Sequence, residues 1–324
     1  MNIHSAYQTN AVYPIEMLVL SHSTRSSMRD CERKGIEFKQ MFGTPPVEER
    51  DYSGETGQAL HVGLAHWMLS QDEIEATVAF MMKFPYDLEL LKPSNDGRSL
   101  EACFATLDQL MNSHTLKPYQ VANIKTQAGE IRPCVEVPFA IKITGSPMPI
   151  PVWYVGLMDL ILYNNTEDRF VVIDLKTTRQ HLSDVYARFQ FDEQVIPYGI
   201  ILEHALGKRI EELDVNYLWA YIDILKPTHE MVEVKKTQID IHDWLRGLCD
   251  DIDRIAKHYH MGWFPRATSG NSCISYNRKC HFFDECYFRD PVVLKSIING
   301  TPRRELFRNG DQPWITAELP YMGA

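Results

Sequence analysis

The clearest pattern along the chain is a pair of apolar runs within residues 152–178, both rich in β-branched and aromatic side chains. Turn-forming residues separate the two runs at positions 164–168, so the pattern predicts a β-hairpin. Charged residues interrupt both runs where a buried strand would otherwise hold Val, Ile or Leu. Asp159 lies in the first run, and Asp174 and Lys176 lie near the end of the second. Alternation along a strand places Asp174 and Lys176 on one face.

The register of this hairpin brings the two aspartates together. If the hairpin closes symmetrically about the bond between Thr166 and Glu167, Asp159 lies directly opposite Asp174, with about 5 Å between their Cβ atoms. Two carboxylates held together in a buried sheet repel each other strongly unless a cation lies between them. The pattern therefore predicts a metal site in the hairpin.

The rest of the pattern predicts helices before the hairpin and both helices and strands around it. Helices are expected over 21–38 (with an N-cap at Ser21), 58–69, 71–82, 100–112, 183–206 and 239–260, and residues 43–57 are expected to form a loop. Strands are expected over 135–144, 215–224 and 231–236. A helix between strands of one sheet indicates an α/β fold. We expect a central mixed β-sheet flanked by helices, with an N-terminal helical segment and a C-terminal cysteine-cluster region.

Composition narrows the class of protein. The 324 residues are 44% apolar, enough for a substantial core. A formal net charge of −10 argues against non-specific coating of nucleic acid, although it allows a local basic channel. The N-terminus lacks a secretory pattern, and no apolar run approaches the roughly 20 residues that span a bilayer. We therefore expect a cytoplasmic protein without disulfides, in a bacterium or, if phage-encoded, in its host.

Five short motifs follow one another along the chain. The motifs are Gly57-Gln58-Ala59-Leu60-His61, Glu136-Val137-Pro138-Phe139, Gly156-Leu157-Met158-Asp159, Asp174-Leu175-Lys176-Thr177-Thr178 and Gln194-Val195-Ile196-Pro197-Tyr198. With them the chain resembles the RecB-type branch of the PD-(D/E)XK nucleases, which also holds the AddB subunit and the CRISPR-adaptation nucleases. The resemblance covers about Cys31 to Cys286. It implies a restriction-endonuclease-like core, with residues 1–324 as one nuclease domain and 58–130 as a helical segment within it.

The resemblance implies a set of metal ligands. They would be His61, Asp159, Asp174 and the backbone carbonyl of Leu175, which together would bind one or two divalent cations. Oxygen-rich ligation suits Mg²⁺, and the imidazole makes Mn²⁺ suitable as well. Such a cation polarises the scissile phosphate and lowers the pKa of a bound water.

Catalytic roles are implied for residues beside these ligands. Lys176 would orient the attacking water or stabilise charge on the phosphate. Gln194 and Tyr198, four apart on a predicted helix, would brace the site or touch the DNA backbone. Each feature alone has an ordinary explanation, since histidines such as His61 are often structural and Glu136 fits a structural or surface role equally well. The prediction of an active site rests on all these motifs occurring together and in this order.

Three of the seven cysteines crowd near the C-terminus, whereas Cys103, Cys134 and Cys249 are scattered in apolar contexts and read as core residues. The resemblance implies that Cys31, Cys273, Cys280 and Cys286 hold a [4Fe–4S] cluster, joining region 264–290 to Cys31. The six-residue gap between the first two C-terminal cysteines departs from the closer pair usual in the family. Tetrahedral zinc is the alternative, and simple thiols are a third.

The expected substrate is DNA. Phosphate contacts are predicted for Arg179, Arg188, Arg278 and Lys279, although such residues are often solvated surface charges. We expect a metal-dependent deoxyribonuclease, an exonuclease on single strands or DNA ends, in repair, recombination, phage replication or CRISPR adaptation, with proteins of those processes as partners. The alternative is a non-catalytic DNA-end-binding or assembly module. The complete charged set favours the enzyme, because unpaired buried charges are costly. A zinc-bound regulatory protein would not explain the aspartate pair.

Overall fold

The computed structural model describes residues 15–42, 52–89, 97–267, 273–275, 278–280, 282, 286, 306–307 and 312–322. The chain divides into two compact units. One comprises Met1–Glu48, Ala140–Gly156 and His242–Ala324, and the other comprises Glu49–Phe139 and Leu157–Ile241. Strands β5 (Val135–Thr144) and β6 (Val152–Asn164) each contribute residues to both units.

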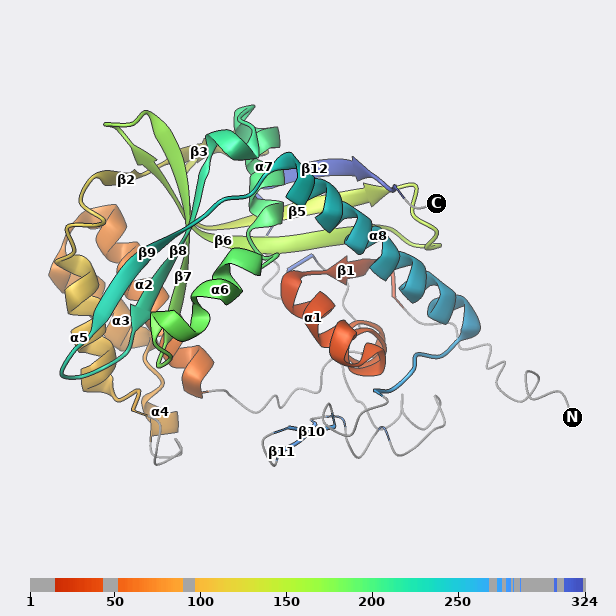
Figure 1. The fold of residues 1–324 in the computed structure, drawn as a ribbon, viewed down its shortest axis with the longest axis horizontal. Coiled ribbons are helices and arrows are strands. Elements are labelled where there is room, and N and C mark those ends of the chain that lie inside the picture. The colour runs from red at the N-terminus through yellow and green to blue at the C-terminus, as the bar shows by residue number, and fades with distance from the viewer. Residues whose placement is uncertain are drawn as a thin grey trace, which may run out of the picture. The chain divides into compact units, whose positions relative to one another are not determined.

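Eight strands form a mixed sheet (Figure 1). The order is β12-β5-β6-β7-β8-β9, with β1 and β2 also paired to β6. The bounds are β1 Leu18–Leu20, β2 Tyr119–Val121, β7 Arg169–Thr178, β8 Asp214–Tyr221, β9 Thr228–Val234 and β12 Ile315–Pro320. Pairs β1·β6 and β7·β8 are parallel, whereas β2·β6, β6·β7 and β8·β9 are antiparallel. The predicted α/β class with a central mixed sheet flanked by helices is confirmed.

The hairpin formed by β6 and β7 has the predicted register. Its pairs run from Asn164↔Arg169 to Leu160↔Ile173, so each pair of residue numbers sums to 333. The Asn164 side chain fixes the turn, because its Oδ1 accepts hydrogen bonds from the backbone N–H groups of Thr166 and Glu167 at 3.0 and 3.3 Å. This is the local chemistry by which asparagine favours turns.

In the unit that contains β7–β9, helices cover both faces of the strands. Helices α2 (Tyr52–Ser70), α3 (Glu73–Lys83), α4 (Tyr86–Glu89) and α5 (Leu100–Met111) lie to one side of these strands in Figure 1. Residues of α2, α3 and α5 share a core with Val171, Ile173 and Leu175 of β7. The opposite face meets α6 (Leu182–Phe191), where Phe189 stacks on Tyr217 of β8 with ring centroids 4.7 Å apart.

Smaller elements complete this unit. A second antiparallel sheet joins β3 (Asn123–Lys125) to β4 (Ile131–Pro133), and α7 (Ile196–Leu206) is followed by the 3₁₀ helix η3 (Ile210–Glu212). The N-terminal caps of two helices explain where those helices begin. The Asp72 side chain caps α3 by accepting from Ile74 N–H and Glu75 N–H, and Ser99 caps α5 by accepting from Ala102 N–H.

Four expectations about the elements were wrong. The predicted helix 21–38 is two elements, a helix over His22–Asp30 and a π-helix over Arg33–Phe42, because the backbone of Cys31 between them is extended. The predicted helix 183–206 is two helices, α6 and α7, separated by residues 192–195. The predicted helical segment 58–130 has helices only as far as Met111, and residues 119–125 hold β2 and β3. Residues 52–57, expected in a loop, belong to α2.

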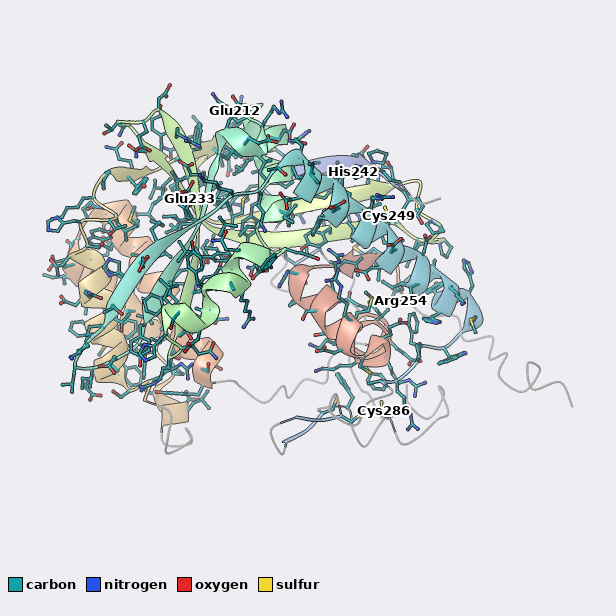
Figure 2. All side chains as sticks on the ribbon, in the orientation of Figure 1. Glu212, Glu233, His242, Cys249, Arg254 and Cys286 are labelled. Carbon is teal, nitrogen blue, oxygen red and sulfur yellow. The ribbon has the colours of Figure 1, made fainter. Side chains whose placement is uncertain are left out.

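The other unit is built on α1 (His22–Asp30), the π-helix η2 (Arg33–Phe42) and α8 (Gln238–Met261). Ser21 caps α1 as predicted, accepting from Thr24 N–H at 3.2 Å. A charged network fastens α1 to α8 because Arg25 Nε donates to Asp251 Oδ2 at 2.8 Å, with both side chains buried. Arg254, labelled in Figure 2, joins this network by contacting Asp251 and Glu32.

The longest described helix is α8, with 24 residues, and it carries charged side chains along its length. Within the described ranges of the chain, no helix combines the length and apolar character needed to cross a membrane.

Candidate active site

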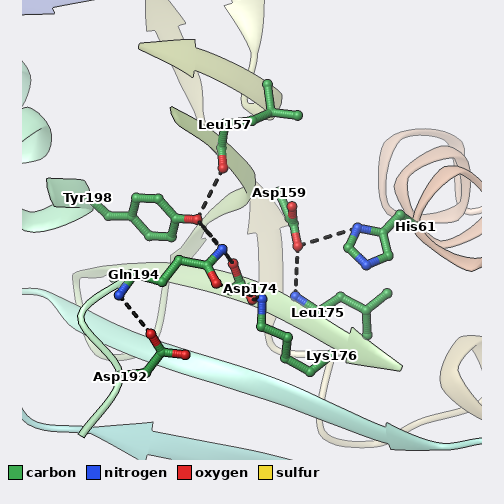
Figure 3. A network of polar contacts seen from close by, with 9 residues as sticks. All are labelled: His61, Leu157, Asp159, Asp174, Leu175, Lys176, Asp192, Gln194 and Tyr198. Carbon is green, nitrogen blue, oxygen red and sulfur yellow. Dashed lines mark hydrogen bonds and ion pairs between the residues drawn. The ribbon is translucent and has the colours of Figure 1, made fainter. Parts of the chain in front are cut away.

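Strands β6 and β7 part where the two aspartates lie. Their pairing ends at Leu160↔Ile173, one position before Asp159 and Asp174. The N–H of Leu175 donates instead to Asp159 Oδ2 at 2.8 Å (Figure 3). The Asp159 carboxylate therefore takes the place of a strand partner and lies in the opening of the hairpin.

His61 approaches this opening from α2. Its Nδ1 lies 3.4 Å from Asp159 Oδ2 (Figure 3). Gly57, one helical turn earlier, explains how the helix comes so close, because a Cβ atom at that position would lie 3.0 Å from Thr177 Oγ1 on β7. The glycine and histidine of the first motif thus act together: one lets α2 approach the active strand, and the other reaches the carboxylate.

Asp174 and Lys176 form the centre of a polar network. Asp174 is 1% exposed, and its Oδ2 lies 2.5 Å from Lys176 Nζ. The Gln194 amide bridges the pair, since its Nε2 donates to Asp174 Oδ1 and its Oε1 accepts from Lys176 Nζ, both at 2.9 Å. The Tyr198 hydroxyl accepts from Gln194 Nε2 at 3.1 Å. It also lies 3.1 Å from Asp174 Oδ1 and from the Leu157 carbonyl, either of which can accept its proton.

Gln194 reaches this network from a turn, which corrects its predicted position on a helix with Tyr198. Helix α7 begins at Ile196, and Pro197 occupies its first turn, where proline is well tolerated. The turn before it is held by Asp192, whose Oδ1 accepts from Gln194 N–H at 2.9 Å. Gln194 and Tyr198 nevertheless meet, as predicted from their spacing.

Burial and neighbouring charges shift the pKa values of two groups in the site. Burial raises the pKa of Asp159 to about 6; Asp174 also raises it, while His61, the Leu175 N–H and Lys176 lower it. Burial, with the charges of Asp174 and Asp159, likewise raises the pKa of Tyr198 well above its usual range, so its hydroxyl stays protonated. Two neighbouring carboxylates with a single ammonium group against one of them form a site that favours an additional cation.

The donors at this site suit a hard divalent cation. Asp159 and Asp174 supply carboxylate oxygens, and His61 supplies a ring nitrogen. The carbonyl of a strand residue points to the same side as its N–H, so the Leu175 carbonyl faces the side on which Asp159 lies. In the part of the chain that the structure describes, no three His, Cys, Asp or Glu side chains form a complete metal-binding group as placed. Asp159 Oδ2 accepts from the Leu175 N–H, and Asp174 Oδ2 lies against the Lys176 ammonium.

Other predicted residues are placed differently. Glu136 is exposed on β5, with φ of +47°. Arg179 lies just past β7 and packs over Gly97, where a Cβ atom would be 1.6 Å from its Nη1. Arg188 is exposed on α6. The side chains of Arg278 and Lys279 lie outside the described part of the chain.

The two cysteines separated by the six-residue gap lie at the ends of a small hairpin. Strand β10 (Ile274–Ser275) pairs with β11 (Arg278–Lys279), and continuing that register places Cys273 opposite Cys280. The Cys280 N–H donates to the Cys273 carbonyl at 2.7 Å. The unusual spacing therefore has a structural cause, because the pairing of β10 with β11 brings the backbones of Cys273 and Cys280 together.

Cys31 and Cys286 belong to the same neighbourhood. All seven cysteines are free thiols, and Cys286 is labelled in Figure 2. Burial raises the pKa of Cys286 to about 11; Arg33 lowers it, and Cys31, Cys280 and Cys273 raise it. The Phe38 and Phe282 rings, 4.7 Å apart, join η2 to the cysteine region. The scattered Cys103, Cys134 and Cys249 are buried, as predicted.

Sequence reasoning missed supporting residues of the site. Asp192 lies two residues before Gln194, a spacing typical of an aspartate that caps a turn. Tyr217 pairs with Asp174 across β7 and β8, and its ring centroid lies 5.6 Å from Lys176 Nζ. A tyrosine within an apolar strand gives no signal in the sequence that it faces a lysine.

Comparison with known proteins gives three results. A family profile described as the PD-(D/E)XK nuclease superfamily matches residues 20–287. A crystal structure of a protein from Eubacterium rectale, provisionally described as an exonuclease, is 14% identical, with a TM-score of 0.45 over 93% of this chain and 99% of that chain. The structure of SSO0001 is also 14% identical, with a TM-score of 0.25 over 61% of this chain and 74% of that chain. No curated protein matches the sequence.

Proposed function

The chain belongs to the PD-(D/E)XK nuclease superfamily, and on that premise we propose that it is a metal-dependent deoxyribonuclease that hydrolyses phosphodiester bonds with Mg²⁺ or Mn²⁺. The observation that carries the proposal is the arrangement around Asp174. Its buried carboxylate contacts Lys176, Gln194 and Tyr198, while Asp159 and His61 occupy the adjacent hairpin opening.

The residues of the site would have different roles in hydrolysis. Asp159, Asp174, His61 and the Leu175 carbonyl would hold the cation, which lowers the pKa of a bound water and polarises the phosphate. The ammonium of Lys176, held by Asp174 and Gln194, would orient the attacking water and balance negative charge as it develops on the phosphate. Because Gln194 also contacts Asp174, it fixes the lysine relative to the ligands.

We propose DNA single strands or DNA ends as the substrate and exonucleolytic digestion as the reaction. Arg179 beside β7 and the exposed Arg188 on α6 are the proposed phosphate contacts near the site. The net charge of −10 suits transient binding through a local patch better than tight coating of DNA. A role in repair, recombination, phage replication or CRISPR adaptation, with proteins of those processes as partners, follows from the resemblance to the RecB-type branch, as does a cytoplasmic location.

A non-catalytic DNA-end-binding module is the competing function. Such a module would not need Asp174 and Lys176 as a buried ion pair, since charges cost free energy to bury even when paired. The complete charged network therefore favours the enzyme.

The decisive experiment is digestion of end-labelled single-stranded and double-stranded DNA with Mg²⁺ or Mn²⁺. Wild type should degrade at least one substrate, and Asp174→Ala and Lys176→Ala should lose activity by at least a hundredfold. Lys176→Ala should keep the metal-induced rise in melting temperature, whereas Asp174→Ala should lose it. Equal cleavage by all three proteins would identify a contaminant. Tight DNA-end binding without cleavage would favour the non-catalytic module.

We also propose that Cys31, Cys273, Cys280 and Cys286 hold a [4Fe–4S] cluster. Four cysteines in one neighbourhood, two of them opposite each other in the backbone register of β10 and β11, fit the donor set of such a cluster. When bound, the cluster would serve as a structural link. It would join Cys31 at the end of α1 to a segment more than 240 positions later in the chain. Four cysteine thiolates could instead bind zinc in a tetrahedral site.

The bound element can be identified directly. Protein purified without oxygen should be brown and contain about four irons per chain, and Cys280→Ala should lose the colour and melt at a lower temperature. Cys103→Ser is the matched control, because Cys103 is buried in the core of the other unit. A colourless wild-type protein that contains zinc and no iron would contradict the cluster, with no bearing on the nuclease proposal.

A further inference from the structure

Three aromatic side chains form a row beside Lys176. Trp219 and Tyr221 lie two apart on β8, with ring centroids 6.0 Å apart and an angle of 27° between the rings. His181 stacks on Tyr221, with centroids 5.0 Å apart and an angle of 16°. Exposure increases along the row, because Trp219 is 5% exposed, Tyr221 is half-buried and His181 is exposed. The row therefore ends at the surface in the imidazole ring of His181.

Hydrogen bonds hold this row in place. Trp219 Nε1 donates to the carbonyl of Gln180 at 3.3 Å, and the N–H of Gln180 donates to Thr178 Oγ1 at 3.0 Å. His181 follows directly and occupies the N-cap position of α6, where its side chain makes no capping hydrogen bond. N-cap positions favour Ser, Thr, Asp or Asn, so the start of the helix does not account for a histidine here. Its stacking on Tyr221 gives the row a preformed flat end.

The row lies close to the proposed catalytic lysine. In the parallel register of β7 and β8, Lys176 pairs with Trp219 and Thr178 pairs with Tyr221. A rise of about 3.3 Å per residue and a strand separation of about 4.8 Å place the Cα atoms of Lys176 and Tyr221 about 8 Å apart. A stacked DNA strand advances about 3.4 Å per nucleotide. A base on His181 would therefore lie roughly two to four nucleotides from a phosphate held at Lys176.

We propose that the ring of His181, supported by Tyr221 and Trp219, stacks on an unpaired base of the DNA strand that enters the active site. The inference rests on the proposed function, because the spacing is counted from a phosphate at Lys176. Aromatic rings stack on every kind of base, so the row selects for an unpaired base rather than for its identity. In a duplex, neighbouring base pairs cover the base faces. The row thus makes single strands the preferred substrate.

DNA binding without catalysis tests the contact. Fluorescence anisotropy with a labelled oligothymidine strand in EDTA measures affinity while cleavage is prevented. His181→Ala should weaken binding about five- to hundredfold, because one base loses its stacking partner. His181→Phe should keep wild-type affinity to within about threefold, since phenylalanine also stacks. His114→Ala is the matched control, because His114 is exposed in the turn after α5, which lies on the opposite face of the sheet, and it should leave binding unchanged.

Removal of the bases identifies what the ring contacts. An abasic strand of the same length keeps every phosphate but offers no base to stack on. Wild type and His181→Ala should bind this strand equally to within about twofold, because the variant loses only a contact that the strand already lacks. The two proteins should also bind a blunt hairpin duplex equally. On oligothymidine their affinities should fall with salt at the same slope, since no phosphate contact differs between them.

Several outcomes would overturn the proposal. They are a wild type that does not bind the single strand, a His181→Ala variant that binds it as tightly as wild type, or a difference that persists on the abasic strand or the duplex. A His181→Phe variant as weak as His181→Ala would equally exclude stacking.

These tests separate the row from the nuclease proposal. A protein that cleaves DNA but fails them would keep the proposed function and lose the stacking contact. A protein that passes them without cleaving DNA would keep the contact and lose the nuclease assignment.

Discussion

Asp159 Oδ2 accepts a hydrogen bond of 2.8 Å from the backbone N–H of Leu175, immediately beyond the last paired residues of the β6–β7 hairpin. A strand that separates from its neighbour normally leaves buried N–H groups without partners, which is costly. Here a carboxylate replaces the neighbouring strand's backbone. The hairpin can thus open at the aspartates, and His61, Asp174 and Lys176 can gather around the opening (Figure 3).

Replacing Asp159 by Asn should separate stability from metal binding. Asparagine retains an acceptor for the Leu175 N–H and removes one of two neighbouring negative charges, so the metal-free variant should melt at the wild-type temperature or up to about 4 °C higher. The stabilisation that Mn²⁺ gives the wild type should disappear, because one carboxylate ligand is neutral. Thermal melts with and without Mn²⁺ measure both effects. Asp108→Asn, at an exposed position of α5, should keep the Mn²⁺ response. A metal-free variant that melts far below wild type would contradict this account of the opening.

Gly57→Ala should impair the site more than it impairs folding. The new Cβ would lie 3.0 Å from Thr177 Oγ1, closer than ordinary van der Waals contact, so either the Thr177 side chain or α2, which carries His61, must give by a few tenths of an ångström. Alanine gains up to about 1 kcal/mol within a helix, which offsets the crowding in the overall stability. We expect nuclease activity to fall tenfold to a hundredfold.

A second substitution identifies the cause of that loss. Thr177→Ala, added to Gly57→Ala, removes the crowded atom and should restore most of the activity. Gly247→Ala on α8 is the matched control, because its Cβ would meet Arg25 Nη2 at an ordinary 3.5 Å. Full activity in Gly57→Ala would show that close approach to Thr177 is not needed.

Gln194 should matter more than Tyr198. Gln194→Leu removes the contacts to both Asp174 and Lys176, so we expect kcat/KM to fall about a hundredfold. Tyr198→Phe loses only the hydroxyl contacts and keeps its edge-on packing against Phe139, with ring centroids 5.9 Å apart. We expect about a tenfold loss. Both variants should keep the metal-induced rise in melting temperature, and a larger loss for Tyr198→Phe would reverse the assigned order.

The local patterns in the sequence were sufficient for the central hairpin. The turn-forming Asn164 and the alternation on either side of it fixed a register that the structure confirms through Leu160. Strand β5 and helix α5 were equally clear, because each has a long, consistent period. The metal-site and catalytic assignments built on that register remain predictions.

Features that depend on packing at a distance could not be predicted. Strand β1, only Leu18–Leu20, is too short to show alternation and exists through its parallel pairing with β6. The approach of Gly57 to Thr177 joins residues 120 positions apart. Pro197 fell inside the predicted helix 183–206 but lies in the first turn of α7, because Asp192 holds the preceding turn. The cysteine spacing looked irregular until the β10–β11 hairpin explained it.

Asp251 should be a major source of stability in the unit that contains α1 and α8. Its carboxylate contacts Arg25 at 2.8 Å, Arg254 at 3.2 Å and Arg29 at 3.5 Å. Asp251→Ala leaves the buried Arg25 guanidinium without its carboxylate and should lower the free energy of unfolding by about 3–5 kcal/mol. Arg29→Ala, whose side chain is 45% exposed, should cost less than about 1 kcal/mol. Urea unfolding measures both free energies. Similar decreases for the two variants would show that the Asp251–Arg25 contact does not contribute more than the Asp251–Arg29 contact.

His229 should make the fold less stable at mildly acidic pH. Its Nε2 lies 2.5 Å from Ser113 Oγ and its Nδ1 lies 3.3 Å from Gln109 Oε1, joining β9 to α5 and the turn after it. Burial lowers the pKa of His229 below its ordinary 6.5. At a pH between the lower pKa of the folded state and the ordinary 6.5 of the unfolded state, the unfolded chain binds more protons than the folded chain. The free energy of unfolding therefore falls as pH drops below 6.5.

His229→Gln tests the direction of this pH dependence, because glutamine can still form a hydrogen bond with Ser113 but does not titrate. The difference in unfolding free energy between wild type and variant should favour wild type at pH 7.5 and shrink steadily as pH falls below 6.5. The exposed His242 on α8 provides a His→Gln control outside the contact with Ser113 and Gln109. If the His229 difference instead grew towards acidic pH, protonation would be stabilising this contact. The hydrogen bonds to Ser113 and Gln109 would then outweigh the cost of burying the charged ring.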